Sequence, residues 1–417
     1  MGRIYMFRKS IPLKWFVAAL LLLATAKLTA QEALRASMAG DLAAASRKQA
    51  QNTVGHYNLM WGPVTLRASS GLSEQYSDHA GNSANGSSDL ITRPSANIQL
   101  NWPVTEYNTL NLSLDAGYSF YSQNSALDQF FFNPGSGLSF DIYIGSWVID
   151  LHDRLTMSEN SYNNPTAHEA QGTSTFQNDG GVSGMWDLNK LVVNVGYDHV
   201  NYMNLGQGGA SQPDSSTENL SINTGVRMTP TIMVGPEVGG TLVTYDQTGS
   251  ALVSNGTQWS AGAFSSFQVS EHLSLRLDGG FTDYTPETTK TNLNQTMTGL
   301  YFQLSLSHQV NEHVSYTVSA GRSIDFSYNG LYDRLFFTVS PSWLIIRDFA
   351  FSTPLSWEQD TRSGTSYSQW SAGFLVGHPI TKKLSASLSY QWIDETSNQA
   401  NYSYTANIAG LNFTYQF

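Results

Sequence analysis

The stretch that decides the fold stands at the end of the chain and reads Gly410-Leu411-Asn412-Phe413-Thr414-Tyr415-Gln416-Phe417. Large apolar side chains occupy every second position from 411 to 417, and polar side chains lie between them. Because side chains alternate across a strand, this period of two residues predicts a β-strand with one apolar and one polar face. Such a strand fits either the edge of a soluble β domain or the wall of a membrane barrel, and the rest of the chain favours the barrel.

The other end of the chain has the pattern of a secretory leader. Residues 1–14 contain basic and no acidic residues, residues 15–26 are a largely apolar run, and small residues follow. This order predicts a signal peptide over residues 1–30, cleaved after Ala30 or Ala26. The apolar run is shorter than the roughly 20 residues that a membrane-spanning helix needs.

The composition excludes several classes of protein. Charged residues make up 13% of the chain, where about 25% is usual for soluble domains. Removal of the leader takes away basic residues only and leaves a net charge of about −16, which argues against a nucleic-acid partner. The absence of cysteine excludes disulfides, lipoprotein attachment and thiolate metal sites. A transmembrane β-barrel, with an apolar outer wall and a polar lumen, fits this composition.

From about residue 54 onward, alternating strands come in pairs joined by a tight polar turn and separated by longer loops. We expect tight turns at Thr105–Asn108, His152–Asp153, Asp187–Lys190, Thr229–Pro230, Ser270–His272, Asn311–His313, Arg347–Asp348 and Thr381–Lys383. Short periplasmic turns and longer extracellular loops are typical of transmembrane antiparallel up-and-down β-barrels. The pattern therefore predicts an all-β barrel of about 18 strands, or 16 if two segments are misread.

An even number of strands lets the last strand pair with the first and removes every open edge. The chain then divides into the signal peptide 1–30, an N-terminal periplasmic segment 31–62 and the outer-membrane β-barrel 63–417. The segment 31–62 is Ala-rich and expected to be partly helical, and it could plug the lumen. A short strand at 54–60 is compatible with the pattern, and a β-bulge is expected at Ala409-Gly410, where the apolar positions change parity.

Three phrases of the chain resemble the β-barrel porin families of Gram-negative bacteria. They are Tyr57-Asn58-Leu59-Met60-Trp61-Gly62-Pro63-Val64, Phe140-Asp141-Ile142-Tyr143-Ile144-Gly145 and Gly196-Tyr197-Asp198-His199. The last strand also resembles the signal that barrel-assembly machinery reads, and its apolar positions are Leu411, Phe413, Tyr415 and Phe417. The resemblance implies a location in the cell outer membrane, in contact with its lipids and that machinery. It also implies a pore, which in some family members accompanies exopolysaccharide export.

The polar face of each expected strand carries the candidate functional residues. The charged residues predicted to face the lumen are Arg67, Arg93, Asp115, Asp141, Arg154, Arg227, Glu237, Arg276, Asp278 and Arg334. An Arg or Lys that faces lipid at mid-depth costs about 2–4 kcal/mol, so strand parity is enforced physically. Opposed patches of arginines and carboxylates would set a field across the lumen and filter solutes. Alternatively, these groups pair with each other and fill the wall.

The leading interpretation is a non-enzymatic outer-membrane channel for small polar or saccharide solutes, either passive or part of a polysaccharide export route. No metal-binding His spacing and no nucleophile-elbow motif occur, so no metal site and no cofactor are predicted. Two alternatives stay open. One is an outer-membrane hydrolase with residues assembled from different strands, and the other is a structural barrel whose lumen is occluded.

Deletion of Phe417 or the substitution Phe417→Asp should lower the amount of barrel in the outer membrane and increase periplasmic degradation. The physical reason is that the aromatic last strand both pairs within the wall and is recognised during assembly. Quantitative blotting of membrane and periplasmic fractions measures the effect. Unchanged levels in both variants would show that Phe417 is an ordinary strand residue.

Overall fold

The computed structural model describes residues 57–80, 86–159, 174–205, 214–246, 255–287, 296–327, 330–345, 349–362, 365–399 and 403–417. The predicted signal peptide and residues 31–56 of the N-terminal segment lie outside these ranges. A search of these ranges finds no helix with the length and apolar character needed to cross a membrane.

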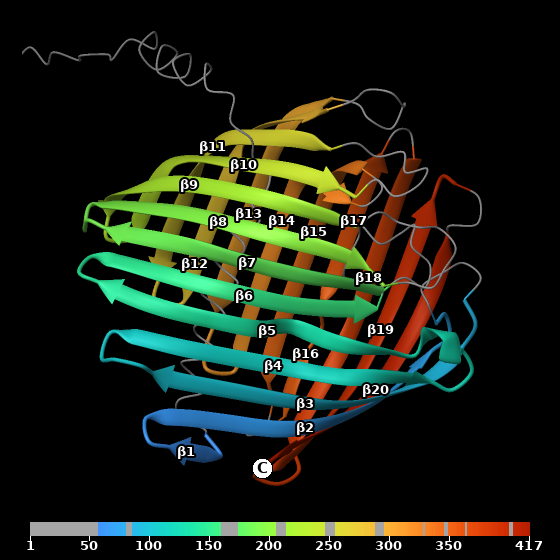
Figure 1. Cartoon of the computed structure of the whole chain (residues 1–417). Helices are drawn as coiled ribbons and strands as arrows, with labels where there is room; N and C mark the ends of the chain where they lie inside the picture. The colour runs from blue at the N-terminus through green and yellow to red at the C-terminus, as the bar shows by residue number, and fades with distance from the viewer. Residues whose placement is uncertain are drawn as a thin grey trace, which may run out of the picture.

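The described chain forms one antiparallel sheet that closes into a barrel (Figure 1). Its strands are β1 (Leu59–Trp61), β2 (Val64–Ser77), β3 (Asp89–Pro103), β4 (Asn108–Tyr121), β5 (Gln129–Ile144), β6 (Trp147–Glu159), β7 (Ser174–Asp187), β8 (Leu191–Asn204), β9 (Ser215–Thr229), β10 (Ile232–Tyr245), β11 (Gly256–Ser270), β12 (Leu273–Pro286), β13 (Met297–Gln309), β14 (Val314–Ser327), β15 (Gly330–Leu344), β16 (Ala350–Ser352), β17 (Leu355–Arg362), β18 (Thr365–Pro379), β19 (Leu384–Ser397) and β20 (Tyr404–Gln416). A short 3-10 helix, Ser125–Leu127, follows β4.

Each wall strand pairs with the next along the chain, and β20 pairs with β2 to close the wall. The strands β16 and β17 both pair with β15 and β18, so they share one position in the wall. The strand β1 pairs only with the start of β2. The described wall therefore has 18 strands, and the predicted antiparallel barrel of about 18 strands is confirmed.

Two local predictions are wrong. Residues His152 and Asp153 lie inside β6, and the turn before β6 is Gly145-Ser146, where Gly145 has a φ of 61°. Glycine adopts this left-handed conformation without the steric cost of a side chain. The β-bulge expected at Ala409-Gly410 is absent, because β20 keeps an unbroken register with both β19 and β2 through these residues. The turn predicted at Arg347–Asp348 lies outside the described residues.

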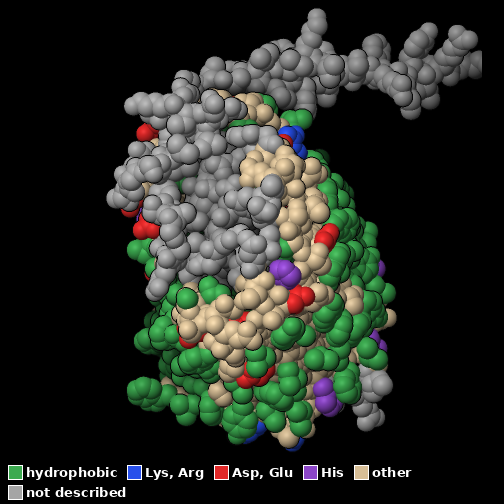
Figure 2. Space-filling view, turned by 90° about the vertical axis from the view of Figure 1, so that its right-hand side faces the viewer, with side chains coloured by type: hydrophobic (Ala, Val, Ile, Leu, Met, Phe, Trp, Pro, Cys, Tyr) green, Lys and Arg blue, Asp and Glu red, His purple; other side chains and the backbone are tan. Residues whose placement is uncertain are grey.

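Apolar side chains alternate with polar ones along the wall strands and are exposed on the outer face. The exposed fractions of Leu138, Leu220 and Leu411 are 42%, 42% and 41%. Figure 2 looks onto the end with the longer connections and shows hydrophobic side chains spread over the visible wall. Exposed apolar side chains around a closed barrel match a wall that faces lipid.

Two groups of hydrogen bonds reinforce the closing pair β2–β20 at its ends. At the short-turn end, the Asn58 side-chain nitrogen donates to the carbonyl oxygens of Ala68 and Phe417, at 2.8 and 2.6 Å. At the other end, the backbone and side-chain nitrogens of Asn407 each donate to the Asp78 carboxylate at 2.7 Å. The contacts Asn58–Phe417 and Asn407–Asp78 join residues more than 300 positions apart in the chain, so they form only when the barrel closes.

Burial of the Asp78 carboxyl alone would raise its pKa, but the hydrogen bonds from Asn407 and His79 lower it below its ordinary value. A carboxyl with a depressed pKa in the folded state stabilises the fold above its unfolded pKa, about 3.9. This contribution is lost as the pH falls through the folded pKa.

The substitution Asp78→Ala should lower the stability of the barrel by roughly 1–3 kcal/mol near neutral pH, because it removes charge-assisted hydrogen bonds at the closing strand pair. The midpoint of heat-modifiable gel migration in detergent measures this loss, and it should shrink below about pH 4. The exposed turn residue Glu106 supplies a control, Glu106→Ala. A loss that stays constant down to pH 3 would contradict the assigned role of the carboxylate.

Candidate functional site: the charged inner wall

Acidic side chains dominate the buried charged residues of the described chain. The buried acidic residues of the described chain are Asp89, Asp141, Asp150, Asp198, Glu237, Asp278, Asp360 and Glu395. No lysine or arginine of the described chain is buried to the same degree. These residues lie on the strand faces opposite the exposed apolar side chains, so carboxylates are concentrated on the inner face of the wall.

The first cluster joins β6, β7 and β8 around His152. The two ring nitrogens of His152 lie 2.7 Å from an oxygen of Asp150 and 2.8 Å from an oxygen of Asp198. The Arg154 guanidinium contacts the Asp179 carboxylate at 3.1 Å in the same cluster. A carboxylate can only accept hydrogen bonds, so both contacts are satisfied together when His152 carries a proton on each nitrogen.

The same cluster has the residue types of a metal site. Ligand atoms of His152, Asp179 and Asp198 all lie within 4.8 Å of one another. A metal ion needs a ring nitrogen with a free lone pair, whereas both nitrogens of His152 face carboxylates and Arg154 pairs with Asp179. The contacts therefore favour a network of ion pairs at this position.

The second cluster lies on β10, β12 and β13. The Arg276 guanidinium forms a hydrogen-bonded ion pair with Asp278 at 2.8 Å and lies 5.0 Å from the centre of the Phe264 ring. The Tyr301 hydroxyl donates to Glu237 at 2.8 Å, and Glu237, Asp278 and Tyr301 are all buried. The two carboxylates of this cluster, Glu237 and Asp278, thus lie near a single arginine, Arg276.

The third cluster spans β15 to β19. The Arg334 guanidinium contacts Glu358 at 2.8 Å and lies 5.2 Å from the centre of the Phe336 ring. Asp360 is the register partner of Arg334, and Gln369 of β18 is the register partner of both Glu358 and Glu395. Asp360 and Glu395 are buried on the same face of the wall as the Arg334–Glu358 pair. Acidic groups thus outnumber basic groups in this cluster too.

The structure brings together five of the ten charged residues that the sequence singled out. Arg154, Glu237, Arg276, Asp278 and Arg334 belong to the three clusters. The other five lie elsewhere on the wall: Arg67 on β2, Arg93 on β3 bonded to Gln75 and Ser119, Asp115 on β4, Asp141 buried on β5, and Arg227 paired with Asp187 near the short turns.

The charged cluster residues that the prediction of lumen-facing groups missed are Asp150, His152, Asp179, Asp198, Glu358, Asp360 and Glu395. The assignment of His152-Asp153 to a turn left the part of β6 before Arg154 out of the parity argument. The alternation of Trp147, Ile149 and Leu151 could have identified Asp150 and His152 as residues of the opposite face.

Two polar pairs lie on the outer face, where they share parity with exposed apolar residues. The Asn178 side chain donates to Asp153 at 2.6 Å, and His199 contacts Glu218 at 2.7 Å. Asp153, Gly180, His199 and Glu218 are consecutive partners in the register across β6 to β9. These outer pairs provide charge-matched controls for the inner clusters.

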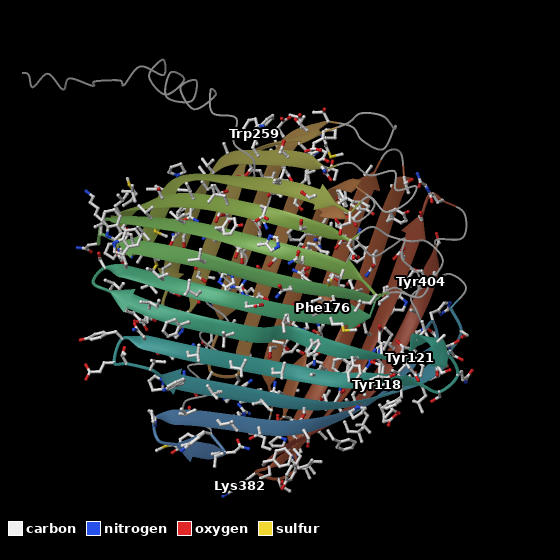
Figure 3. All side chains as sticks on the ribbon, viewed as in Figure 1. Tyr118, Tyr121, Phe176, Trp259, Lys382 and Tyr404 are labelled. Atoms are coloured by element: carbon white, nitrogen blue, oxygen red, sulfur yellow. The ribbon has the colours of Figure 1, made fainter. Side chains whose placement is uncertain are left out.

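Figure 3 shows how side chains mark the two ends of the barrel. Tyr118, Tyr121 and Tyr404 lie toward the end with the longer connections, whereas Lys382 lies in a short turn at the opposite end. Tyr118 packs edge-on against Phe130 with ring centres 4.8 Å apart. Tyr118, Phe120 and Phe130 share the outer face, where aromatic rings at the rim of an apolar wall are typical of a membrane interface. Tyr121 and Tyr404 instead pack with inward-facing apolar residues.

A family model described as "Putative beta-barrel porin 2" matches residues 52–417. A crystal structure of Pseudomonas aeruginosa OccK2 (OpdF) is similar over 85% of this chain and 97% of its own, with 10% identity and a TM-score of 0.50. The same channel in complex with glucuronate covers 85% and 98% at 10% identity, with a TM-score of 0.49. The likeness at this identity concerns the fold. None of the curated proteins matches the chain.

The substitution His152→Gln should destabilise the barrel by about 3–5 kcal/mol, because it leaves two buried carboxylates without their positive partner. The outer-face substitution His199→Gln should cost about 0–1 kcal/mol, since its pair is about 40% exposed. Unfolding in denaturant, followed by tryptophan fluorescence, compares the two. Adding Asp150→Asn and Asp198→Asn to His152→Gln should recover most of the loss, and a failure to recover it would show that packing rather than charge is responsible.

Proposed function

The chain belongs to the family described as Putative beta-barrel porin 2, and we propose that this outer-membrane channel passes cations and small neutral polar solutes in preference to anions. The observation that carries the proposal is the set of eight buried carboxylates on the inner face, which no equally buried lysine or arginine offsets among the described residues. Rings of carboxylates favour cations in channels.

The arginines of the three clusters do not reverse this sign. Arg154, Arg276 and Arg334 each contact a carboxylate within about 3 Å, so each is neutralised at short range. Each cluster contains more acidic than basic groups, and this excess gives the inner wall its negative sign. Inside a low-dielectric wall this potential is focused and reaches solutes within about a Debye length, ~8 Å at physiological salt.

An uncharged recess supports passage of saccharides. A cavity of about 250 Å³ near the short turns of β18 and β19 is lined by small and hydroxyl- or amide-bearing residues, among them Ser385, Ser387, Asn412 and Thr414. Its lining also includes His378 but no aspartate, glutamate, lysine or arginine. Hydroxyl and amide groups donate and accept hydrogen bonds without charge, which suits a neutral sugar.

Membership in a porin family supports a channel and gives no support to the hydrolase alternative. Participation in exopolysaccharide export remains a further proposal, which the neutral recess makes chemically reasonable. The occluded barrel differs from the channel in one property, conductance, and deletion of residues 31–53 tests whether that segment is the plug.

In planar bilayers with a KCl gradient, the reversal potential should show cation preference. The double substitution Asp360→Asn and Glu395→Gln should lower the ratio of potassium to chloride permeability at least twofold, because it removes two inner charges and keeps side-chain volume. The outer-face control, Asp153→Asn with Glu218→Gln, removes the same charge and should leave the ratio unchanged. Anion preference in the unmodified channel would overturn the proposal.

A further inference from the structure

The pairing between β13 and β14 stops halfway along the wall. It runs from Gln309↔Ser315 to Phe302↔Arg322. Beyond this point β13 continues to Met297 while pairing with β12, and β14 continues to Ser327 while pairing with β15. Among the described residues, each strand therefore extends about five residues past the last pair that joins the two.

Beyond the last shared pair, β14 lies on the inner side of β13. Gly299 lies on the inner side of β13, between Met297 and the buried Tyr301, and a Cβ placed on it would lie 3.2 Å from Ile324 Cδ1 and 3.8 Å from Arg322 Nη2. Arg322 and Ile324 share strand parity with Ala320, which pairs with Leu304 of the outer face. The outer side of β14 therefore lies against the inner side of β13.

A contact deeper in the barrel supports this arrangement. The Gln258 side-chain nitrogen, on the inner face of β11 and fully buried, lies 3.5 Å from the Ile324 carbonyl oxygen. The end of β14 thus reaches inward past β13 and β12. We call Met297–Phe302 of β13 together with Arg322–Ile324 of β14 the overlap seam.

The overlap seam is open toward the outside and closed toward the inside. The exposed fraction of Leu300 is 64%, against 41–42% for leucines such as Leu220 and Leu242, whose strands pair on both sides at that level. On the inner side, Ile324 is 1% exposed and packs with Tyr284 and Met297. The passage between the two strands is therefore closed by apolar side chains.

Polar groups stand at the entrance of the seam. Arg322 and Asp333 form an ion pair at 2.7 Å, with exposed fractions of 37% and 33%. Arg322 lies five residues before the end of β14 and Asp333 three residues after the start of β15, both toward the end with the longer connections, so the pair is placed to meet the polar head of a molecule at that end. Leu300 and Phe302, 48% exposed, supply apolar surface beside them.

We propose that the overlap seam is a lateral passage through which amphipathic molecules move between the outer leaflet and the barrel interior. The apolar chain would lie along Leu300 and Phe302, and the polar head would hydrogen-bond with Arg322 and Asp333. Opening the wall elsewhere breaks backbone hydrogen bonds that lipid cannot replace. Beyond the pair Phe302↔Arg322 no β13–β14 ladder pair joins the described residues, so opening there requires displacement of Ile324 and breaks no such pair.

The unpaired stretch has the length that such a passage needs. Five strand residues at about 3.3 Å each span roughly 16 Å, which is about half of a hydrocarbon core of ~30 Å. The stretch lies at the end with the longer connections, which is the extracellular end in outer-membrane barrels. The passage therefore serves the outer leaflet, and it is separate from the aqueous route proposed above.

The absence of cysteine in the chain makes single-cysteine labelling a clean test. Met297→Cys places a thiol on the inner side of the seam, next to Ile324. Ser221→Cys places one on the inner face of β9, where the ladder is continuous with β8 and β10. In proteoliposomes, dodecylmaleimide reacts from the bilayer and a sulfonated maleimide reacts from water. The ratio of the two labelling rates should be at least tenfold higher at Met297→Cys than at Ser221→Cys.

Removal of the inner closure provides a second measurement. Ile324→Ala should raise the labelling of Met297→Cys by dodecylmaleimide at least threefold and leave that of Ser221→Cys unchanged. If Met297→Cys does not assemble, Gly299→Cys takes its place, because its thiol would adjoin Ile324. Equal rate ratios at the two positions, or no response to Ile324→Ala, would overturn the lateral passage.

Conductance of the same variants separates this inference from the proposed function. Retained conductance with equal labelling ratios removes the lateral passage and leaves the channel in place. Seam-specific labelling in a barrel without conductance supports the lateral passage and removes the aqueous channel.

Discussion

Backbone pairing is the constraint on which the rest of this structure depends. Lipid offers no hydrogen bonds to an exposed strand edge, so a sheet in the membrane must close on itself. The strands β2 and β20 close this barrel, and they pair from Ser69↔Gln416 to Ser77↔Ile408. This register is shorter than that of β2 with β3, and β1 with Asn58 covers the part of the β2 edge that β20 leaves open.

Closure also determines the chemistry of the interior. In a closed wall every second residue faces inward, and inward groups avoid lipid whatever their polarity. Carboxylates can therefore accumulate on the inner face, provided that hydrogen bonds and ion pairs support them. The pairs His152–Asp198 and Arg276–Asp278 show two ways of doing so, one across strands and one along a single strand.

Much of this architecture could be predicted from the sequence because it depends on local period and turn chemistry. The alternation in residues 411–417 and the polar turns were sufficient for the barrel and its strand number. The same reasoning failed at His152-Asp153 because two consecutive polar residues resemble a turn, whereas in β6 His152 lies on the inner face and Asp153 lies on the outer face with Asn178. It failed at Ala409-Gly410 because Ile408, an apolar residue, faces inward and packs with Ile393 and Ala406.

The partners of the inner charges and the overlap seam lay beyond sequence reasoning for a different reason. His152 and Asp198 are 46 residues apart, and their contact depends on the register of three strands, which period alone does not fix. At the seam, a Cβ at position 299 would lie 3.2 Å from Ile324 Cδ1, and Gly299 has no feature in the sequence that separates it from other strand glycines. At the seam, β13 and β14 no longer pair edge to edge, and Ile324 lies against Gly299. Burial of Ile324 against Tyr284 closes the wall there, whereas elsewhere the backbone hydrogen-bond ladder closes it.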